Sequence, residues 1–263
     1  MKLFGLVKPP LVEGPGIVFG IPVPHNFPLA YKLADGSAIL PVTTTVITTW
    51  IIMAFLVLLF RWGTKDLSLE NPSKKQAFFE TLYHFYDSVV GQILGKWKDK
   101  YLVYISSLLT FLFISNTITF FPVPWLSRTD VGWSLHYLFR APTADLNTTV
   151  GLALITTMAF LSAAFATSGP VGYFKGLLEP FPLMLPLNIV GEGAKPVNIS
   201  MRLFGNMFAG SVILGLLYKA APAVVPAPLH LYFDLFSGAI QSYVFTMLTM
   251  VYIQGALGDA QPE

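Results

Sequence analysis

The chain contains five apolar segments that are each long enough to cross a lipid bilayer, and this feature restricts its fold more than any other. A helix needs roughly 20 apolar residues to span about 30 Å of hydrocarbon, where it must satisfy its own backbone hydrogen bonds. Hydrophobic residues make up 54% of the 263 residues and charged residues only 11%, which is unlike a soluble domain. We therefore predict an all-α integral membrane protein. The expected spans are 42–60, 101–121, 146–166, 187–217 and 229–256.

Basic residues indicate which side of the membrane each connection occupies. Residues 61–100 carry seven Lys and Arg side chains, whereas the next connection holds only Arg128 and Arg140. Because basic residues concentrate on the cytoplasmic side, the first connection is expected to be cytoplasmic, with the amino terminus outside and the carboxyl terminus inside. Residues 1–41 contain seven prolines and no uninterrupted apolar core, so we expect an extracytoplasmic arm and no cleaved signal peptide. Residues 42–263 are expected to form a single membrane domain.

Two further helical features are predicted. An amphipathic helix at about 72–95, opened by Asn71 as cap and Pro72 in the first turn, has the pattern of a helix that lies in the membrane interface. The fourth span has helical character from Leu187 to Leu217, about 46 Å at 1.5 Å per residue. Because this exceeds the bilayer, the helix should tilt, bend near Pro196 or begin outside the hydrocarbon.

Arg202 is an unusual residue for the middle of an apolar span. Its guanidinium stays charged at any physiological pH, and placing it at mid-membrane costs roughly 3 kcal/mol, so such a residue usually has a function. Asn206 lies one turn away on the same helix face. Small residues follow at 205, 209, 210 and 215, which suits either ordinary helix packing or the surface against a moving partner. A static ion pair between Arg202 and Asp234 is an alternative.

Polar groups occur on both sides of Arg202. Along the fourth helix, Glu192 lies about 15 Å toward the cytoplasm and Ser211 about 13 Å toward the outside. Glu192 either belongs to a path or forms an interfacial pair with Lys195. Two further polar residues, Asp145 and Asn147, lie at the outer start of the third span, where capping is the alternative role. The last span contains Asp234, Gln241 and Tyr252 at spacings that return to one helix face.

These positions describe two polar half-paths that enter from opposite sides and meet a fixed cation. A continuous polar pore would leak ions. An arginine at the junction repels free cations but attracts a carboxylate that another subunit carries past it. The residues themselves therefore favour a stator for ion transfer.

Three motifs carry a resemblance to a known family. The run from Lys195 to Gly210, KPVNISMRLFGNMFAG, closely resembles the signature of subunit a of F-type ATP synthases, and so do PTADLN at 142–147 and the segment from Gln241 to Tyr252, which ends in LTMVY. The motifs occur in family order, and the resemblance covers roughly residues 40–256. It departs from the family at Ser211, where many relatives have glutamate, and at Asp234, where some have histidine or glutamate.

The resemblance implies a subunit of the bacterial inner membrane that has no cofactor and is not itself an enzyme. Its last two spans would be long and tilted against a ring of c subunits, each with a membrane carboxylate that meets Arg202. A peripheral stalk of b subunits and the rest of the synthase would be further partners. Asn206 and Gln241 match residues that line the interface with the rotor, with Glu192 in a cytoplasmic half-channel and Asp145, Asn147 and Asp234 in an outer one. Either H⁺ or Na⁺ would pass transiently, with no fixed metal site.

Other functional classes fit the sequence less well. A self-contained secondary transporter or channel with a site at Arg202 and Asp234 is the main alternative, but no internal repeat is evident. A membrane enzyme that uses Asp145, His136 or His230 lacks a motif for a metal site or triad. Cysteine is absent, no GxxxxGK[ST] phosphate loop occurs, and the net charge of +2 does not indicate nucleic acid.

Overall fold

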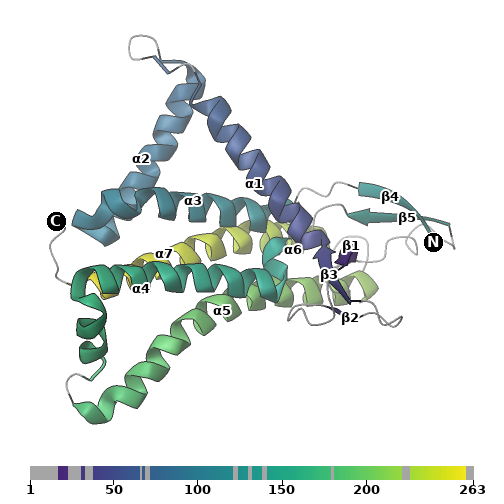
Figure 1. The fold of residues 1–263 in the computed structure, drawn as a ribbon. Coiled ribbons are helices and arrows are strands. Elements are labelled where there is room, and N and C mark those ends of the chain that lie inside the picture. The colour runs from purple at the N-terminus through teal and green to yellow at the C-terminus, as the bar shows by residue number, and fades with distance from the viewer. Residues whose placement is uncertain are drawn as a thin grey trace.

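The protein was analysed as a computed structural model that describes residues 17–22, 31–32, 38–65, 67–68, 72–120, 124–129, 132–137, 141–178, 181–220 and 226–258. Seven α-helices, one π-helix, four short 3₁₀ turns and five short strands occur in these ranges (Figure 1). The helices are α1 (Thr44–Gly63), α2 (Lys74–Leu94), α3 (Lys98–Thr117), α4 (Leu146–Gly176), α5 (Leu185–Ala220), α6 (Pro226–His230), η6 (Leu231–Ser237, the π-helix) and α7 (Gly238–Leu257). The 3₁₀ turns are η2 (Gly95–Trp97), η3 (Ile118–Phe120), η4 (Pro142–Ala144) and η5 (Pro182–Met184).

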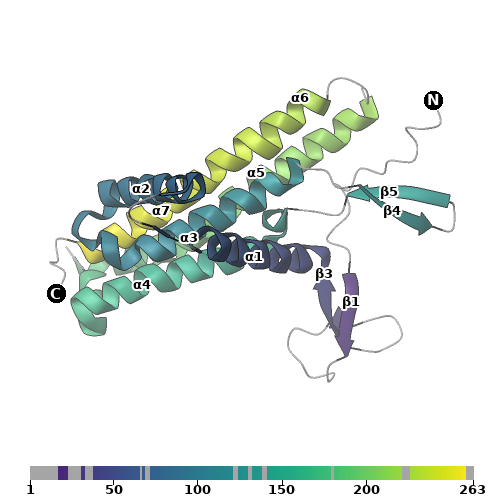
Figure 2. The same ribbon diagram turned by 90° about the horizontal axis from the view of Figure 1, so that it is seen from above.

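Helices α3, α4 and α7 form the centre of the molecule, where they lie side by side (Figures 1 and 2). One buried cluster joins them near the end of α7, with Ile105 from α3, Phe160 from α4 and Met250 from α7. A second cluster links α3 and α7 to α5 through Leu112, Leu203 and Phe245. Helix α5 is therefore anchored on the bundle by its middle.

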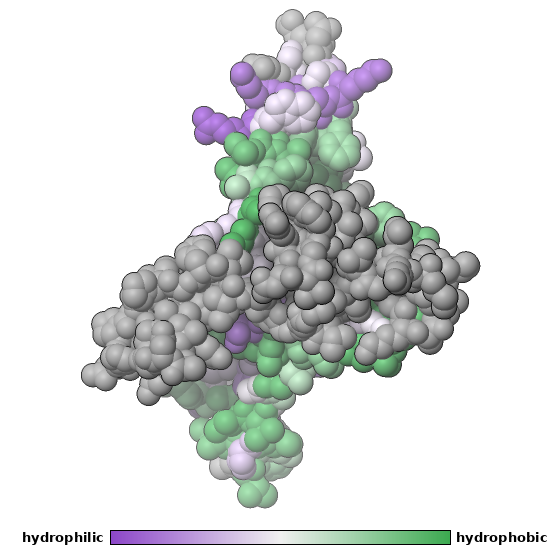
Figure 3. Space-filling view, turned by 90° about the vertical axis from the view of Figure 1, so that its right-hand side faces the viewer, coloured by the Kyte–Doolittle hydropathy of each residue, from purple (hydrophilic) through white to green (hydrophobic). Residues whose placement is uncertain are grey.

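Helix α1 stands apart from this bundle for most of its length. Thr45, Thr48 and Ile52 are buried, but nearly every residue from Met53 to Leu58 is exposed. Figure 3 shows hydrophobic side chains along this region below a hydrophilic group at the top, where α1 ends and α2 begins. Helix α1 closes against α2 at Gly63, where an added Cβ would clash with the Phe79 ring at 2.2 Å. A helix so exposed and apolar is suited to lipid or to another subunit.

The prediction of an all-α membrane domain with five candidate spans is confirmed. Five helical stretches are long and apolar enough to cross a membrane: 44–63, 74–120, 146–176, 185–217 and 228–257. The second stretch joins α2 to α3, which the sequence analysis separated. Helix α2 begins at Lys74, and its cap is Ser73, whose hydroxyl accepts a hydrogen bond from the Gln76 amide. The cap predicted at Asn71 is therefore wrong, and Asn71 lies outside the described residues.

The strands lie at one end of the bundle, beside the beginning of α4 (Figures 1 and 2). Strands β1 (Ile17–Pro22), β2 (Tyr31–Lys32) and β3 (Ala38–Thr43) form an antiparallel sheet in the order β1-β3-β2. Strands β4 (Pro124–Thr129) and β5 (Gly132–Tyr137) form a hairpin between α3 and α4. The sequence analysis did not predict these strands. The end of α7 lies at the opposite end of the bundle.

Helices α4 and α5 diverge at one end, and a break in α4 explains how. Gly169 has φ 66° and ψ 164°, a conformation that side chains other than glycine rarely adopt, and Pro170 follows it. The last turns of α4 therefore bend toward the beginning of α5, which runs obliquely to α4 here (Figure 1). Helix α5 continues through Pro196 for 36 residues, about 54 Å.

Candidate functional site

Two cavities lie along α5, one toward each end. The first has a volume of about 800 Å³, and α5 lines it from Leu187 to Lys195. The second has a volume of about 50 Å³, and α5 lines it from Asn206 to Leu214. Arg202 lies on the stretch of α5 between them. In the middle of α5, Ile199 and Leu203 are buried against the bundle, while Arg202 is exposed.

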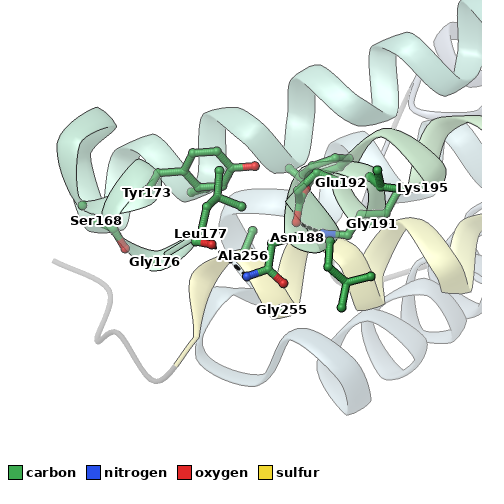
Figure 4. A pocket seen from close by; sticks show the side chains of 15 residues that line it. Ser168, Tyr173, Gly176, Leu177, Asn188, Gly191, Glu192, Lys195, Gly255 and Ala256 are labelled. Atoms are coloured by element: carbon green, nitrogen blue, oxygen red, sulfur yellow. Dashed lines mark hydrogen bonds and ion pairs between the residues drawn. The ribbon is translucent and has the colours of Figure 1, made fainter. Parts of the chain in front are cut away.

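The first cavity forms where the broken tail of α4 faces the beginning of α5 (Figure 4). Glu192 Oε1 forms an ion pair with Lys195 Nζ, while Glu192 Oε2 is buried and has no hydrogen-bond partner in the described structure. Tyr173, on the tail of α4, lines the same cavity. The Asn188 amide donates to the Leu177 carbonyl at 2.8 Å and so ties the two helices together. A carboxylate that lines a cavity of this size is a suitable relay for a cation.

Lys195 is held by aromatic rings as well as by Glu192. Its ammonium lies 5.0 Å from the centre of the Phe160 ring and 5.6 Å from that of Tyr252. The Asn198 amide donates to the Tyr252 hydroxyl at 3.4 Å. Tyr252 therefore lies beside the part of α5 that lines the first cavity. It is near the end of α7, whereas Asp234 precedes the beginning of that helix.

The second cavity brings together Asn206, Ser211 and Asp234. Ser211 donates to the Phe208 carbonyl of its own helix, and Asn206 Oδ1 accepts a 2.9 Å hydrogen bond from the Ser237 hydroxyl. Gly210 allows the close approach, since a Cβ there would lie 3.1 Å from the ring of Phe233. The cavity is therefore a tight polar junction between α5 and the π-helix η6.

Asp234 has a partner that the sequence analysis did not assign to it. His230 Nδ1 lies 2.6 Å from Asp234 Oδ2, and the Asp234 side chain is only 15% exposed. Their spacing of four residues was available in the sequence as a potential contact along one helix face. The expected polar stripe of Asp234, Gln241 and Tyr252 assumed an α-helix throughout. Because η6 is a π-helix, each of its residues turns through a smaller angle about the helix axis than in an α-helix. Asp234 consequently faces α5. Gln241 is buried, and no partner is described for its Nε2.

Arg202 lies on the exposed side of α5. Within the described residues its guanidinium forms no ion pair, and the alternative of a static pair with Asp234 is not observed. Around Gly205, one turn further along, an added Cβ would meet no atom within 4 Å. Arg202 therefore faces away from the bundle that holds α5.

Asp145 and Asn147 do not line either cavity. Asp145 caps α4, since its Oδ1 accepts from the Asn147 amide at 3.0 Å, and its Oδ2 accepts from the Thr45 hydroxyl at 3.0 Å. The capping role is thus observed, and the Asn147 side chain is exposed. Of the residues in the enzyme alternative, His136 lies on β5, where side chains are not described. The described residues contain no group of three His, Cys, Asp or Glu side chains that could hold a metal ion.

Asn116 of α3 bonds a neighbouring helix, as is expected of a polar side chain in a membrane span. Its side chain is fully buried and donates to Ser242 Oγ at 2.8 Å and to the Gly238 carbonyl at 3.3 Å. The Thr143 hydroxyl donates to Asn116 Oδ1. Ser106 and Ser107, in contrast, both donate to the Val103 carbonyl of their own helix.

Comparison with known proteins gives a consistent result over most of the chain. Residues 46–254 match the family described as ATP synthase A chain. A relative from Propionigenium modestum, "ATP synthase subunit a, sodium ion specific", is 60% identical over 264 residues, which cover 99% of this chain and 91% of the relative. A match of this extent includes both cavities and Arg202. The chain therefore belongs to the family of ATP synthase subunit a, the non-catalytic, ion-translocating stator subunit of that complex's membrane sector.

Proposed function

We propose that the two cavities are the inner parts of two offset half-channels, which exchange ions with a rotating ring of c subunits on either side of Arg202. The observation that carries this proposal is their position on one helix, with Arg202 on the stretch between them. An ion cannot pass directly from one to the other, because the fixed positive charge repels it. It must travel on the rotor instead.

The cavity at Glu192 would open to the cytoplasm and the cavity at Asp234 to the outside. The assignment is supported by the basic residues between the first two spans, which indicate the cytoplasmic side. It places the amino terminus outside and the carboxyl terminus in the cytoplasm of a bacterial cell, with α2 in the inner membrane's interface. Glu192 would act as the cytoplasmic relay, while Asn206, Ser211 and Asp234 would form the outer one, with Asp145 and Asn147 near its mouth.

The exposed side of α5 would face the c-ring. Arg202 projects from this side, and Gly205 leaves space for a second helix to approach closely. A rotor carboxylate arriving here would meet the guanidinium in a medium of low dielectric, release its cation and move on. Gln241 and Tyr252 would support α7 beside this surface. The apolar, exposed length of α1 would accept lipid or the b subunits of a peripheral stalk.

We further propose Na⁺ as the transported ion. The relative with 60% identity is named as sodium ion specific. Carboxylate, hydroxyl and amide oxygens at Asp234, Ser211 and Asn206 are ligands that hard cations accept. Asp234 supplies a carboxylate oxygen where some relatives have histidine, whose ligand atoms are nitrogens.

The test is Arg202→Ala in the assembled complex, with Arg61→Ala as a matched loss of an exposed arginine elsewhere. Na⁺-driven ATP synthesis should fall by at least about a hundredfold for Arg202→Ala, because a guanidinium and a carboxylate about 4 Å apart attract by about 4 kcal/mol at an effective dielectric constant of 20. Arg61→Ala should retain synthesis. Full synthesis by assembled Arg202→Ala complexes would contradict the proposal. Substrate-driven flux through the chain alone in liposomes would favour the transporter alternative instead.

A further inference from the structure

The buried side chain of Asn116 connects three separate parts of the chain at the point where the π-helix ends. It belongs to α3, it accepts from Thr143 in η4, and it donates to Gly238 and Ser242 at the beginning of α7. The Ser242 hydroxyl also donates to the Gly238 carbonyl at 2.8 Å. This carbonyl therefore accepts two side-chain hydrogen bonds at the junction of η6 and α7.

Packing at this junction leaves little freedom. A Cβ on Gly238 would lie 3.2 Å from Asn116 Cβ and 3.3 Å from its carbonyl oxygen, so α3 and α7 are in direct backbone contact. Glycine is required here for that approach. The last residue of the π-helix, Ser237, also donates a hydrogen bond to Asn206 and so joins this end to α5. The seven residues that contain Asp234 are thus held from two directions.

A π-helix needs such support, because its backbone geometry is rare and less stable than that of an α-helix. Relaxing η6 to an α-helix would turn Asp234 away from its present direction toward α5. A buried amide with three hydrogen bonds opposes this change, since breaking any of them leaves a polar group without a partner in an apolar region.

We infer that Asn116 is a positioning residue, which holds the π-helical turn in the one register that presents Asp234 to the second cavity. The inference rests on the proposed function of Asp234 in the outer half-channel. Asn116 would act only through this turn and would not contact the ion. Without Asn116, Asp234 would occupy its working position for a smaller fraction of the time, and the apparent ion affinity would fall by that fraction.

The test uses Asn116→Ala, with Ser115→Ala as the matched control. Ser115 is the preceding residue of the same helix and is equally buried, but its hydroxyl has no described partner. The assay is ATP synthesis by the intact complex in vesicles with Na⁺ varied on the outer side. Asn116→Ala should raise the half-maximal Na⁺ concentration about tenfold while most of the maximal rate returns at saturating Na⁺. A merely structural role would lower the maximal rate instead.

A second measurement reports the turn without using activity. Because the chain has no cysteine, Asn206→Cys and Ser237→Cys can be introduced together, and their disulfide yield follows the contact between α5 and η6. Adding Asn116→Ala should lower this yield several-fold, and adding Ser115→Ala should leave it unchanged. Ser242→Ala removes only one hydrogen-bond partner of Asn116, so it should change both the half-maximal Na⁺ concentration and the disulfide yield less. It replaces Asn116→Ala as the test variant if Asn116→Ala does not assemble.

The outcomes separate the two ideas. An unchanged disulfide yield overturns the positioning role of Asn116, whatever the ion dependence shows. A lower yield with an unchanged half-maximal Na⁺ concentration overturns its link to the ion step. The function proposed for Asp234 is tested by Asp234→Asn alone, and if this variant keeps normal outer Na⁺ dependence, that function fails while the disulfide result still stands.

Discussion

Removing Lys195 should increase the affinity of the first cavity for a cation. In the present structure Lys195 neutralises Glu192, and both side chains are 28% exposed. A Na⁺ ion beside Glu192 therefore meets a pair with no net charge, whereas Lys195→Met would leave one negative charge. Unit charges about 4 Å apart interact by about 4 kcal/mol at an effective dielectric constant of 20, and partial exposure reduces this to about 1 kcal/mol.

The assay is ATP-driven Na⁺ uptake into inverted vesicles, where Na⁺ enters from the cytoplasmic face of the complex. An energy of about 1 kcal/mol corresponds to roughly a fivefold fall in the half-maximal Na⁺ concentration. Lys100→Met is the control, because the Lys100 ammonium also lies over an aromatic ring, 5.3 Å from the centre of Trp97, but does not line the cavity. A half-maximal concentration at or above the wild-type value in assembled Lys195→Met complexes would refute this reasoning.

Two further substitutions test the contacts of the outer end. Gly210→Val should destabilise the junction with Phe233 by about 1–3 kcal/mol through overpacking and reduce Na⁺-driven ATP synthesis, in which the ion enters from outside. Gly151→Val, where a Cβ meets open space, should retain that synthesis. Asp145→Ala should lower the thermal stability of the complex by about 1 kcal/mol because it removes the cap of α4 and the partner of Thr45. Asp145→Asn, which keeps an acceptor oxygen, should recover most of that loss, and equal melting temperatures for the two variants would argue against the capping account.

The length and composition of the apolar segments were sufficient to predict five membrane helices. The predicted fourth span, 187–217, differs from α5 by only a few residues at each end, because its apolar residues continue on both sides of Pro196. The third was predicted to end at 166, but α4 continues to Gly176, since Pro170 follows a glycine that absorbs the change of direction. Hydropathy alone does not contain that information.

The arrangement of the polar residues was less predictable. Glu192 and Lys195 are three residues apart, so their pairing follows from helix geometry. The direction of Asp234 does not, because it depends on a π-helix that is held by Asn116 from a helix more than 100 residues earlier. Local spacing predicts local contacts, whereas a rare backbone geometry is selected by tertiary packing.

Pro196 divides α5 mechanically into two parts. Proline has no backbone N–H, so the carbonyl of Glu192, four residues earlier, receives no hydrogen bond from position 196. Beyond it, the helix from Arg202 to Leu214 has no such interruption. Arg202, Asn206 and Ser211 therefore lie on one uninterrupted stretch of helix, while the part of α5 that lines the first cavity precedes the interruption. Under the proposed function, torque applied by a rotor at Arg202 would be borne by the part of α5 beyond Pro196, and the part before it would be mechanically insulated.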